Sequence, residues 1–274
     1  MAKVIDFDRK FMDYADGWLA LHPNLTPRQA EQSYNQIMTD WLNAPAKWLG
    51  GATPGEYFNK FTDPDELVAM VRQYDLSDVG LPEPLYRRIV ALGEASVPAL
   101  MGAIRSKKNK QTFKETLMGM LLDIDSDTCV PLCVELVTKQ DEPNELMEMS
   151  AENLNRKGAG VVGELLDAYE AAAPFAKLMI LEICCKFPGD ERILTYCVQQ
   201  LETNHDYLAL IASFLNDLGD ARAIEPLRKV MSLSEVGYLD YIELKNAIES
   251  LGGEVGDERT FDGDPDYEAM KYMK

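Results

Sequence analysis

Apolar side chains recur along residues 83–251 with the spacing of amphipathic helices. The whole pattern returns about every 32 residues, a period that is typical of helical repeat proteins. Five segments align in one register: LGEASVPALMGAI, DIDSDTCVPLCVELV, NRKGAGVVGELLDAY, FPGDERILTYCVQQL and LGDARAIEPLRKVM. Each segment has an aliphatic anchor at the same place, namely Val97, Val130, Val162, Ile193 and Ile224.

Further apolar or large residues follow each anchor with helical spacing. Three positions on stand Leu100, Cys133, Leu165, Tyr196 and Leu227, and seven positions on stand Ile104, Val137, Tyr169, Gln200 and Met231. A second periodic stretch precedes each segment: PLYRRIVAL, TFKETLMGMLL, LMEMSAENL, FAKLMILEICC and YLALIASFL. Each period is therefore predicted to be a helix, a tight turn and a second helix whose face is buried.

The turns have their own signature, four residues before the anchor. Gly93, Ser126, Gly158 and Gly189 stand there, and Gly219 is displaced by one position. Residues of this kind predict a left-handed cap that ends the first helix of each pair. A pair of short helices cannot bury its apolar face alone, so the pairs are expected to stack into a continuous core.

The segment LGDARAIEPLRKVM, and more loosely LGEASVPALMGAI, resembles HEAT repeats of the short bacterial type that also occur in phycobilisome-lyase-like proteins. The resemblance covers residues 83–251 and implies an all-α fold: a right-handed α-solenoid of about five HEAT-like helix pairs. It implies no particular activity, because the same repeat serves many unrelated roles. The second and third units depart from it, with Asp-Ser-Asp and Lys-Gly-Ala in place of the Gly-Asp turn.

The two ends of the chain fall outside the period. Residues 1–62 contain all three tryptophans, Trp18, Trp41 and Trp48, and Thr26-Pro27, Thr53-Pro54 and Asp63-Pro64 are helix-start signals there. We expect an N-terminal helical subdomain or cap over residues 1–78, the repeats over 79–251 and an acidic tail over 252–274. The large apolar groups of the tail, including Phe261 and Tyr267, favour partial docking onto the repeats.

Composition limits the classes of function. The net charge of -19 falls almost wholly after residue 62, so the repeat region is acidic and should repel nucleic acid. No apolar run is long enough to span a membrane, and the N-terminus lacks the features of a signal peptide. Five cysteines, two of them adjacent, do not suggest a secreted disulfide framework. We therefore expect a cytoplasmic protein with reduced thiols.

Three patterns contain residue types that can form chemical sites. Cys129 and Cys133 share a helix face, and with the Cys184-Cys185 pair they have the ligand type of a zinc site, but they fit better as small core residues. The alternating acids at 123, 125 and 127 and at 262, 264 and 266 echo half of a calcium loop; Asp127 is expected instead to cap the following helix. The two histidines, His22 and His205, sit in no catalytic pattern. No catalytic residue, metal or cofactor is predicted.

Binding is thus the favoured function. The second helices of such repeats commonly line a concave surface, and their polar positions form an acidic candidate site: Glu135, Glu164, Asp167, Gln199, Glu225 and Arg228, joined by Lys229. The sequence predicts a non-enzymatic interaction or scaffold module whose partner is a protein or peptide. The negative charge of the repeat region favours a basic partner. The alternatives are solvated helix faces without a partner, a lyase or DNA-glycosylase-like enzyme on a HEAT-like scaffold, and an N-terminal segment that binds while the repeats act as a spacer. The oligomeric state stays open.

Overall fold

The computed structural model describes residues 4–139, 142–256 and 259–271, and within these residues the chain forms helices and no strand. It divides into two compact units, Met1–Cys129 (unit 1) and Val130–Lys274 (unit 2). The fold is therefore all-α, as predicted. Among the described residues, every helix is too short or too polar to cross a bilayer.

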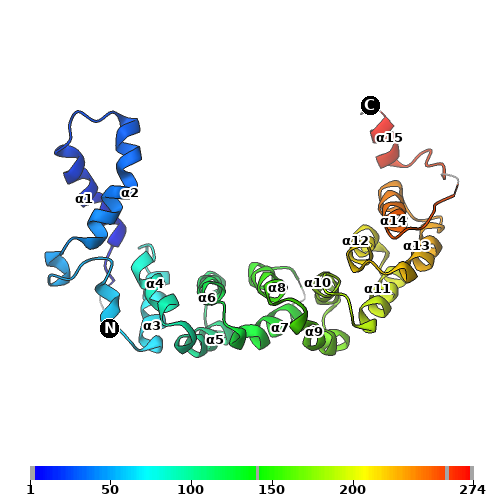
Figure 1. Cartoon of the computed structure of the whole chain (residues 1–274), viewed down its shortest axis with the longest axis horizontal. Coiled ribbons are helices and arrows are strands. Elements are labelled where there is room, and N and C mark those ends of the chain that lie inside the picture. The colour runs from blue at the N-terminus through cyan, green and yellow to red at the C-terminus, as the bar shows by residue number, and fades with distance from the viewer. Residues whose placement is uncertain (1–3, 140–141, 257–258, 272–274) are drawn as a thin grey trace. The chain divides into compact units, whose positions relative to one another are not determined.

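Unit 1 begins with a helical hairpin made of α1 (Phe7–Ala20) and α2 (Pro27–Asn43), which pack against each other (Figure 1). The predicted start of α2 is confirmed: Thr26 and Gln29 form a reciprocal capping box, and Pro27 opens the helix. The base of the hairpin is held by an aromatic cluster in which the Phe7 ring lies 5.4 Å from Trp48 and 5.5 Å from Phe58. Aromatic packing thus fixes α1 to the short turns η1 (Lys47–Leu49) and η2 (Tyr57–Lys60).

The rest of unit 1 contains α3 (Pro64–Asp75), α4 (Glu83–Ala91), α5 (Val97–Arg105) and α6 (Gln111–Ile124), with short turns at Gly93–Ala95 and Asp127–Cys129. The predicted anchor Val97 and its partner Leu100 are fully buried. The N-terminal region is joined to these helices, because η2 contacts α4 and the Arg88 guanidinium donates to the Phe61 carbonyl at 3.0 Å. A hydroxyl of α3, on Tyr74, also exchanges hydrogen bonds with the backbone of Ile5.

Unit 2 has these helices in its described residues: α7 (Val130–Thr138), α8 (Glu145–Lys157), α9 (Val162–Ala168), α10 (Pro174–Cys184), α11 (Glu191–Thr203), α12 (Leu208–Leu218), α13 (Ile224–Met231), α14 (Tyr238–Ser250) and α15 (Pro265–Lys271). Figure 1 shows two rows within this unit, α8, α10, α12 and α14 in one and α7, α9, α11 and α13 in the other. The principal contacts join helices that are next or next but one along the chain, and α7 also contacts α10. The apolar core lies between the two rows.

The predicted buried column breaks at α11. Tyr196 was expected in it, but Ile193, Cys197 and Leu201 are the buried residues of this helix. The physical reason is spacing: these three repeat every four residues, so the buried stripe passes one position beyond Tyr196. The Tyr196 ring instead stacks on Tyr169 with 4.0 Å between ring centroids.

The predicted left-handed cap is confirmed at Gly219, with φ 68° and ψ 20°, and Gly93 also has a positive φ of 56°. Gly158 has a φ of 70°, but its ψ of -150° lies outside the left-handed helical region. Gly189 also has a positive φ, but at 144° it lies outside the left-handed helical region. The turn before α11 is therefore more extended than predicted.

The prediction for Ser126 was wrong, because Asp125 directly before it adopts the left-handed conformation with φ 55°. Ser126 instead uses its hydroxyl to accept the N–H of Thr128. A short polar side chain such as that of Asp125 tolerates this backbone conformation better than most residues do.

The C-terminal segment packs against α14, in agreement with the expected docking. Phe261 is buried, with its ring 4.9 Å from Tyr241 and 5.3 Å from Tyr238. The Arg259 guanidinium donates to the carbonyls of Leu233 and Ser234, both at 2.7 Å. We call residues 259–267 the C-terminal strap.

Candidate partner-binding surface

The predicted site residues all lie on the row formed by α7, α9, α11 and α13. Glu135 and Asp167 each stand five residues after their anchor, whereas Glu164, Gln199, Glu225 and Arg228 stand at four different places relative to theirs. The structure therefore puts the six residues on one row of helices but in several registers.

Most of these charges already have partners on the protein. Asp167 pairs with Arg192 at 2.6 Å, Glu225 with Arg228 at 2.5 Å and Glu135 with Lys139 at 3.0 Å. Lys229, named with them, pairs with Glu202 at 2.6 Å. Among the described residues, only Glu164 and Gln199 of the six have side chains without a hydrogen bond or ion pair. This row is therefore largely neutralised by local pairs.

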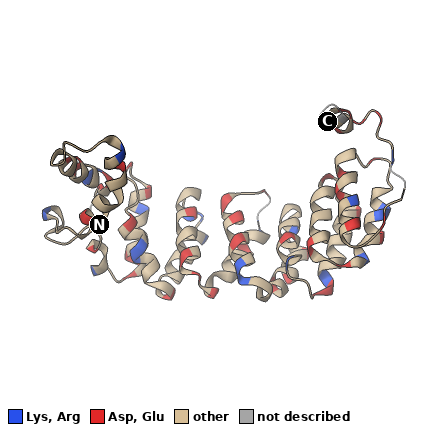
Figure 2. Cartoon of the chain, turned by 45° about the horizontal axis from the view of Figure 1, so that its top comes forward, with Lys and Arg blue, Asp and Glu red and all other residues tan. Residues whose placement is uncertain are grey.

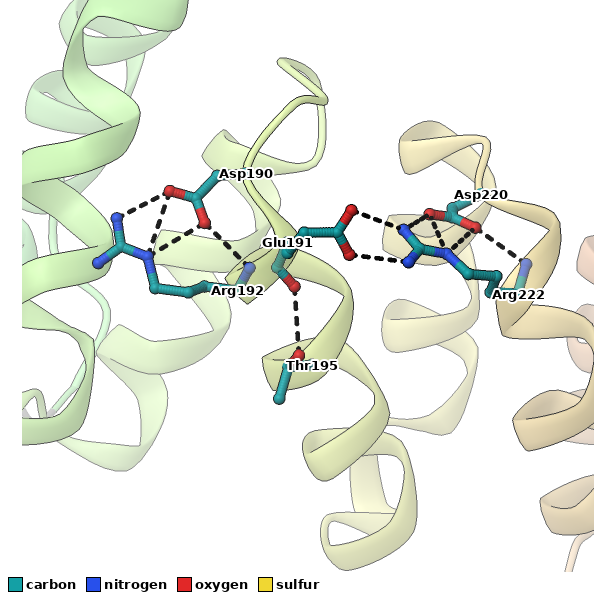
Figure 3. Close-up of polar contacts among 6 residues, drawn as sticks. All are labelled: Asp190, Glu191, Arg192, Thr195, Asp220 and Arg222. Atoms are coloured by element: carbon teal, nitrogen blue, oxygen red, sulfur yellow. Dashed lines mark hydrogen bonds and ion pairs between the residues drawn. The ribbon is translucent and has the colours of Figure 1, made fainter.

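The turns before α11 and α13 carry a linked set of ion pairs (Figure 3). The Asp190 carboxylate accepts the N–H of Arg192 at 2.9 Å and pairs with its guanidinium at 2.8 Å. Asp220 does the same for Arg222, which also reaches Glu191 at 2.8 Å. The arginine lowers the pKa of each aspartate, because its guanidinium and backbone N–H bind the charged carboxylate.

A hollow of about 480 Å³ lies between these two turns, bordered by Leu194 and Leu218 as well as the charged groups. The carboxylates and guanidiniums at its edge are engaged with one another. The hollow consequently offers little free charge to a ligand, and its side chains stabilise the turns.

The opposite row has two hollows between neighbouring helices. The first, about 580 Å³, lies between α8 and α10, and its polar lining is Glu148, Glu152, Asn155, Arg156 and Glu182, with Met179 beside them. The second, about 210 Å³, lies between α12 and α14, and its polar lining is Ser213, Asn216, Glu243, Asn246 and Ser250. Both hollows belong to unit 2, on the same row of helices.

The residues at these hollows repeat along the row in two columns, at the period of the helix pairs. The first column is Glu152, Glu182, Ser213 and Glu243, and the second is Asn155, Lys186, Asn216 and Asn246. The columns stand three or four positions apart, so they share one side of each helix. We call these eight residues the polar face.

Most groups on the polar face are uncommitted. Within the described parts of the chain, the side chains of Glu152, Ser213, Asn216, Glu243 and Asn246 make no hydrogen bond or ion pair, and neither does neighbouring Glu148. The Oδ1 atom of Asn155 is buried and has no partner. Glu182 is the exception, with Lys186 at 3.7 Å. Exposed polar groups beside a hollow are available to a ligand whose hydrogen bonds replace those to water.

The charge of this row is acidic. Helices α8, α10, α12 and α14 contain eight Asp or Glu residues and four Lys or Arg residues. Figure 2 shows acidic residues on the helices of unit 2, with fewer basic ones among them. A cationic partner is therefore attracted, and a phosphate backbone is repelled.

No known protein family matches the chain, and neither does any curated protein. Function is therefore inferred from the chemistry of the residues themselves.

The cysteine pattern behaves as core. All five thiols are buried, and the Sγ atoms of Cys185 and Cys197 lie 3.4 Å apart. Burial raises the pKa of Cys184 to about 12. No three His, Cys, Asp or Glu side chains in the described regions are arranged to hold a metal ion.

The acidic runs and the histidines have structural contacts. Asp264 accepts the backbone N–H groups of Tyr238, Asp266 and Tyr267, and Asp123 accepts the Tyr86 hydroxyl at 2.7 Å. The His22 ring stacks on Trp18 with 3.8 Å between centroids, and His205 opens the turn His205–Tyr207. Asp123 and Asp264 therefore stabilise local structure, and the His22 ring packs on its own helix.

The sequence contained a signal for the polar face. The turn signature is clear only before the second helix of each pair, so the sequence draws attention to those helices. The first helices hold columns that are equally regular, but their polar residues are of mixed type. Only the hollows and the unpaired groups distinguish them from an ordinary solvated face.

Proposed function

We propose that this protein is a non-enzymatic interaction or scaffold module, built as a right-handed α-solenoid of about five HEAT-like helix pairs. Three features support the solenoid: helix contacts inside each unit that join mostly near neighbours along the chain, residues with positive φ between paired helices, and the regular columns of unit 2. Elongated stacks of this kind present long surfaces to a partner.

We place the partner on the polar face of unit 2. Unpaired acids and amides beside the two hollows support this choice. Among the described residues, Glu148, Glu152 and Glu243 have no cation partner. On the other row, comparable acids such as Asp167 and Glu225 already have arginine partners. The partner is accordingly a basic protein or peptide.

The test is the binding of a fluorescent oligolysine peptide to the full-length protein, followed by anisotropy at increasing salt. The double variant Glu148→Gln/Glu152→Gln removes two unpaired charges from the polar face. Glu164→Gln removes an equally unpaired and exposed charge from the other row. All three substitutions preserve side-chain size, so they should leave the fold intact.

We expect salt-sensitive binding that weakens about tenfold in the double variant, since each charge-assisted contact is worth about 1 kcal/mol or less at an exposed site. Glu164→Gln should weaken binding much less. An equal effect per removed charge in the two variants would mean that the peptide senses only net charge. A larger effect of Glu164→Gln would place the site on the row of α9.

A second candidate is favoured by the outer half of the α1–α2 hairpin. No residue from 16 to 36 is buried. Two of these residues have large side chains that are strongly exposed: Leu21 at 79% and Tyr34 at 49%. Large apolar side chains that stay exposed are typical of a protein contact when they form one patch. In this version the hairpin binds an apolar partner and the remaining helices act as a spacer.

The dye ANS, which binds exposed apolar surface, tests this second candidate. Leu21→Ser should reduce ANS fluorescence clearly, whereas Leu76→Ser, at a residue 65% exposed elsewhere in unit 1, should not. Equal responses would show that the hairpin holds no contiguous apolar surface.

A further inference from the structure

The polar face offers the same pair of positions along four neighbouring helices of the row, although Lys186 lies in the turn just after α10. The contacts α8 with α10, α10 with α12 and α12 with α14 make these helices direct neighbours. Packed helices lie about 8–10 Å apart. A bound chain that follows the row therefore meets an equivalent position about every 8–10 Å.

Polyproline II is the one regular backbone conformation whose side chains repeat at this distance. It has three residues per turn and a rise of about 3.1 Å, so equivalent side chains recur about every 9 Å. In a β-strand side chains repeat on one side about every 7 Å, and the pitch of an α-helix is about 5.4 Å. Neither the β-strand nor the α-helix repeats its side chains at the spacing of the four packed helices.

The amide column suits such a backbone. Polyproline II has no internal hydrogen bonds, so its carbonyl and N–H groups need outside partners. The Asn216 and Asn246 side chains are exposed and uncommitted among the described residues, and each carboxamide both donates and accepts. The partnerless Oδ1 of Asn155 adds an acceptor at the first hollow.

Charge along the face is not uniform. Unpaired acids stand at its two ends, Glu148 and Glu152 on α8 and Glu243 on α14, within the described residues. In between, Glu182 is paired with Lys186, and Ser213 is neutral. Three helix spacings separate the ends, which corresponds to about nine residues of polyproline II.

We infer that the polar face binds a proline-rich segment in polyproline II conformation, with a Lys or Arg at each end of a stretch of about nine residues. This inference rests on the proposed function, since it describes the partner of the same surface. The central turns of the segment are uncharged, and the asparagines bind its backbone.

Three labelled peptides of equal length test the inference against the full-length protein. The first is proline-rich with lysines about nine residues apart, the second places the same lysines in an alanine-rich helix, and the third replaces the lysines of the first with glutamates. We expect the first to bind at least about tenfold tighter than the second, since only its backbone presents groups to the asparagines.

The outcomes separate this inference from the proposed function. If the helical lysine peptide binds as tightly as the proline-rich one, the conformation is wrong, while a basic partner on the face still stands. If the glutamate peptide binds as tightly as the lysine peptide, or no peptide binds, both fall.

The asparagines are tested by Asn216→Ala/Asn246→Ala, with Gln199→Ala as control. Gln199 is an exposed amide on α11, in the other row. The double variant should weaken the proline-rich peptide about tenfold, since two hydrogen bonds of about 0.5–1.5 kcal/mol are lost, and should change the helical peptide little. Circular dichroism checks that the helices persist. Equal weakening by Gln199→Ala would overturn the assignment of the asparagines.

Discussion

Arg222 joins two successive turns of unit 2 by donating to both carboxylate oxygens of Glu191, at 2.8 and 3.2 Å, across 31 residues of sequence. The same guanidinium is bound by Asp220 of its own turn. Arg192 repeats the arrangement with Asp190 and Asp167. The Gly-Asp-x-Arg sequence of these turns therefore does two things: the aspartate caps the following turn, and the arginine reaches the preceding pair of helices.

The first prediction concerns the acidity of Asp220. Its pKa is lowered because the Arg222 side chain and backbone N–H bind the charged form. A carboxylate with a depressed folded pKa stabilises the fold above its ordinary pKa and loses this contribution as the pH falls through the folded value. Replacement of Arg222 by glutamine should raise the Asp220 pKa toward the ordinary range, as NMR titration of the carboxyl carbon would show.

Lys229→Gln is the matched control for that titration. It removes a cation from α13, where Lys229 pairs with Glu202 and not with Asp220. The Asp220 pKa should stay low in this variant. A comparable rise in both variants would mean that overall charge, and not the Arg222 contact, sets the value.

The second prediction concerns the thiols. All five cysteines are buried, and burial raises the pKa of Cys184 to about 12. Neutral buried thiols stabilise the fold below their ordinary pKa of about 8.5, and this stability is lost as the pH rises toward the folded value. At pH 8 a thiol reagent such as DTNB should react slowly with the folded protein and with all five thiols once guanidinium unfolds it.

A cysteine introduced at exposed Ser234 provides the internal control for that reaction. Ser234→Cys should add one rapidly reacting thiol and leave the others slow. Rapid reaction of several native thiols in the folded protein would contradict their burial.

Much of the helical framework follows from the sequence, because its signals are local. The capping residues Thr26 and Asp63, each followed by proline, start α2 and α3 where predicted. The anchors Val97, Val162 and Ile193 are buried as their spacing requires, whereas Val130 and Ile224 are only half-buried. The helix α14 is not among the five predicted pairs, because few clear turn signals stand next to its apolar positions.

The candidate site was harder to predict, since pairing depends on tertiary distance. Nothing in the sequence distinguishes Asp167, which is bound by Arg192 from 25 residues away, from Glu152, which has no cation among the described residues. Both are acids on the polar side of an amphipathic helix. The difference appears only when neighbouring helices are side by side.

The third prediction concerns the C-terminal strap. Phe261→Ala should release it, because the residue packs on α14 and is only 6% exposed. Removing a buried Phe costs about 3–5 kcal/mol where the whole core depends on it. The strap can leave separately, so the global free energy of unfolding should fall by less than this.

Trypsin provides the measurement for the strap. The Arg259 side chain is held by the carbonyls of Leu233 and Ser234, and cleavage after Arg259 should accelerate strongly once Phe261 is removed. Met270→Ala, at a residue 48% exposed, is the control and should leave the cleavage rate unchanged. Equal rates in both variants would show that the phenyl ring does not hold the strap.

The fourth prediction concerns Gly253, where the chain turns closely over the end of α14. A Cβ atom at this position would lie 2.7 Å from Ile248 Cγ2 and 3.0 Å from Ile224 Cγ2, and 3.1 Å from the Ile248 carbonyl oxygen. Ile248 is fully buried and cannot retreat far, so Gly253→Ala should lower the free energy of unfolding by about 1–3 kcal/mol. Gly256→Ala makes the same chemical change where no atom lies within 4 Å, and its effect should be small or slightly stabilising.

Urea denaturation followed by circular dichroism compares the Gly253→Ala and Gly256→Ala variants. Equal midpoints would mean that the backbone after α14 shifts freely, and the close packing of Gly253 over Ile224 and Ile248 would then contribute nothing to stability.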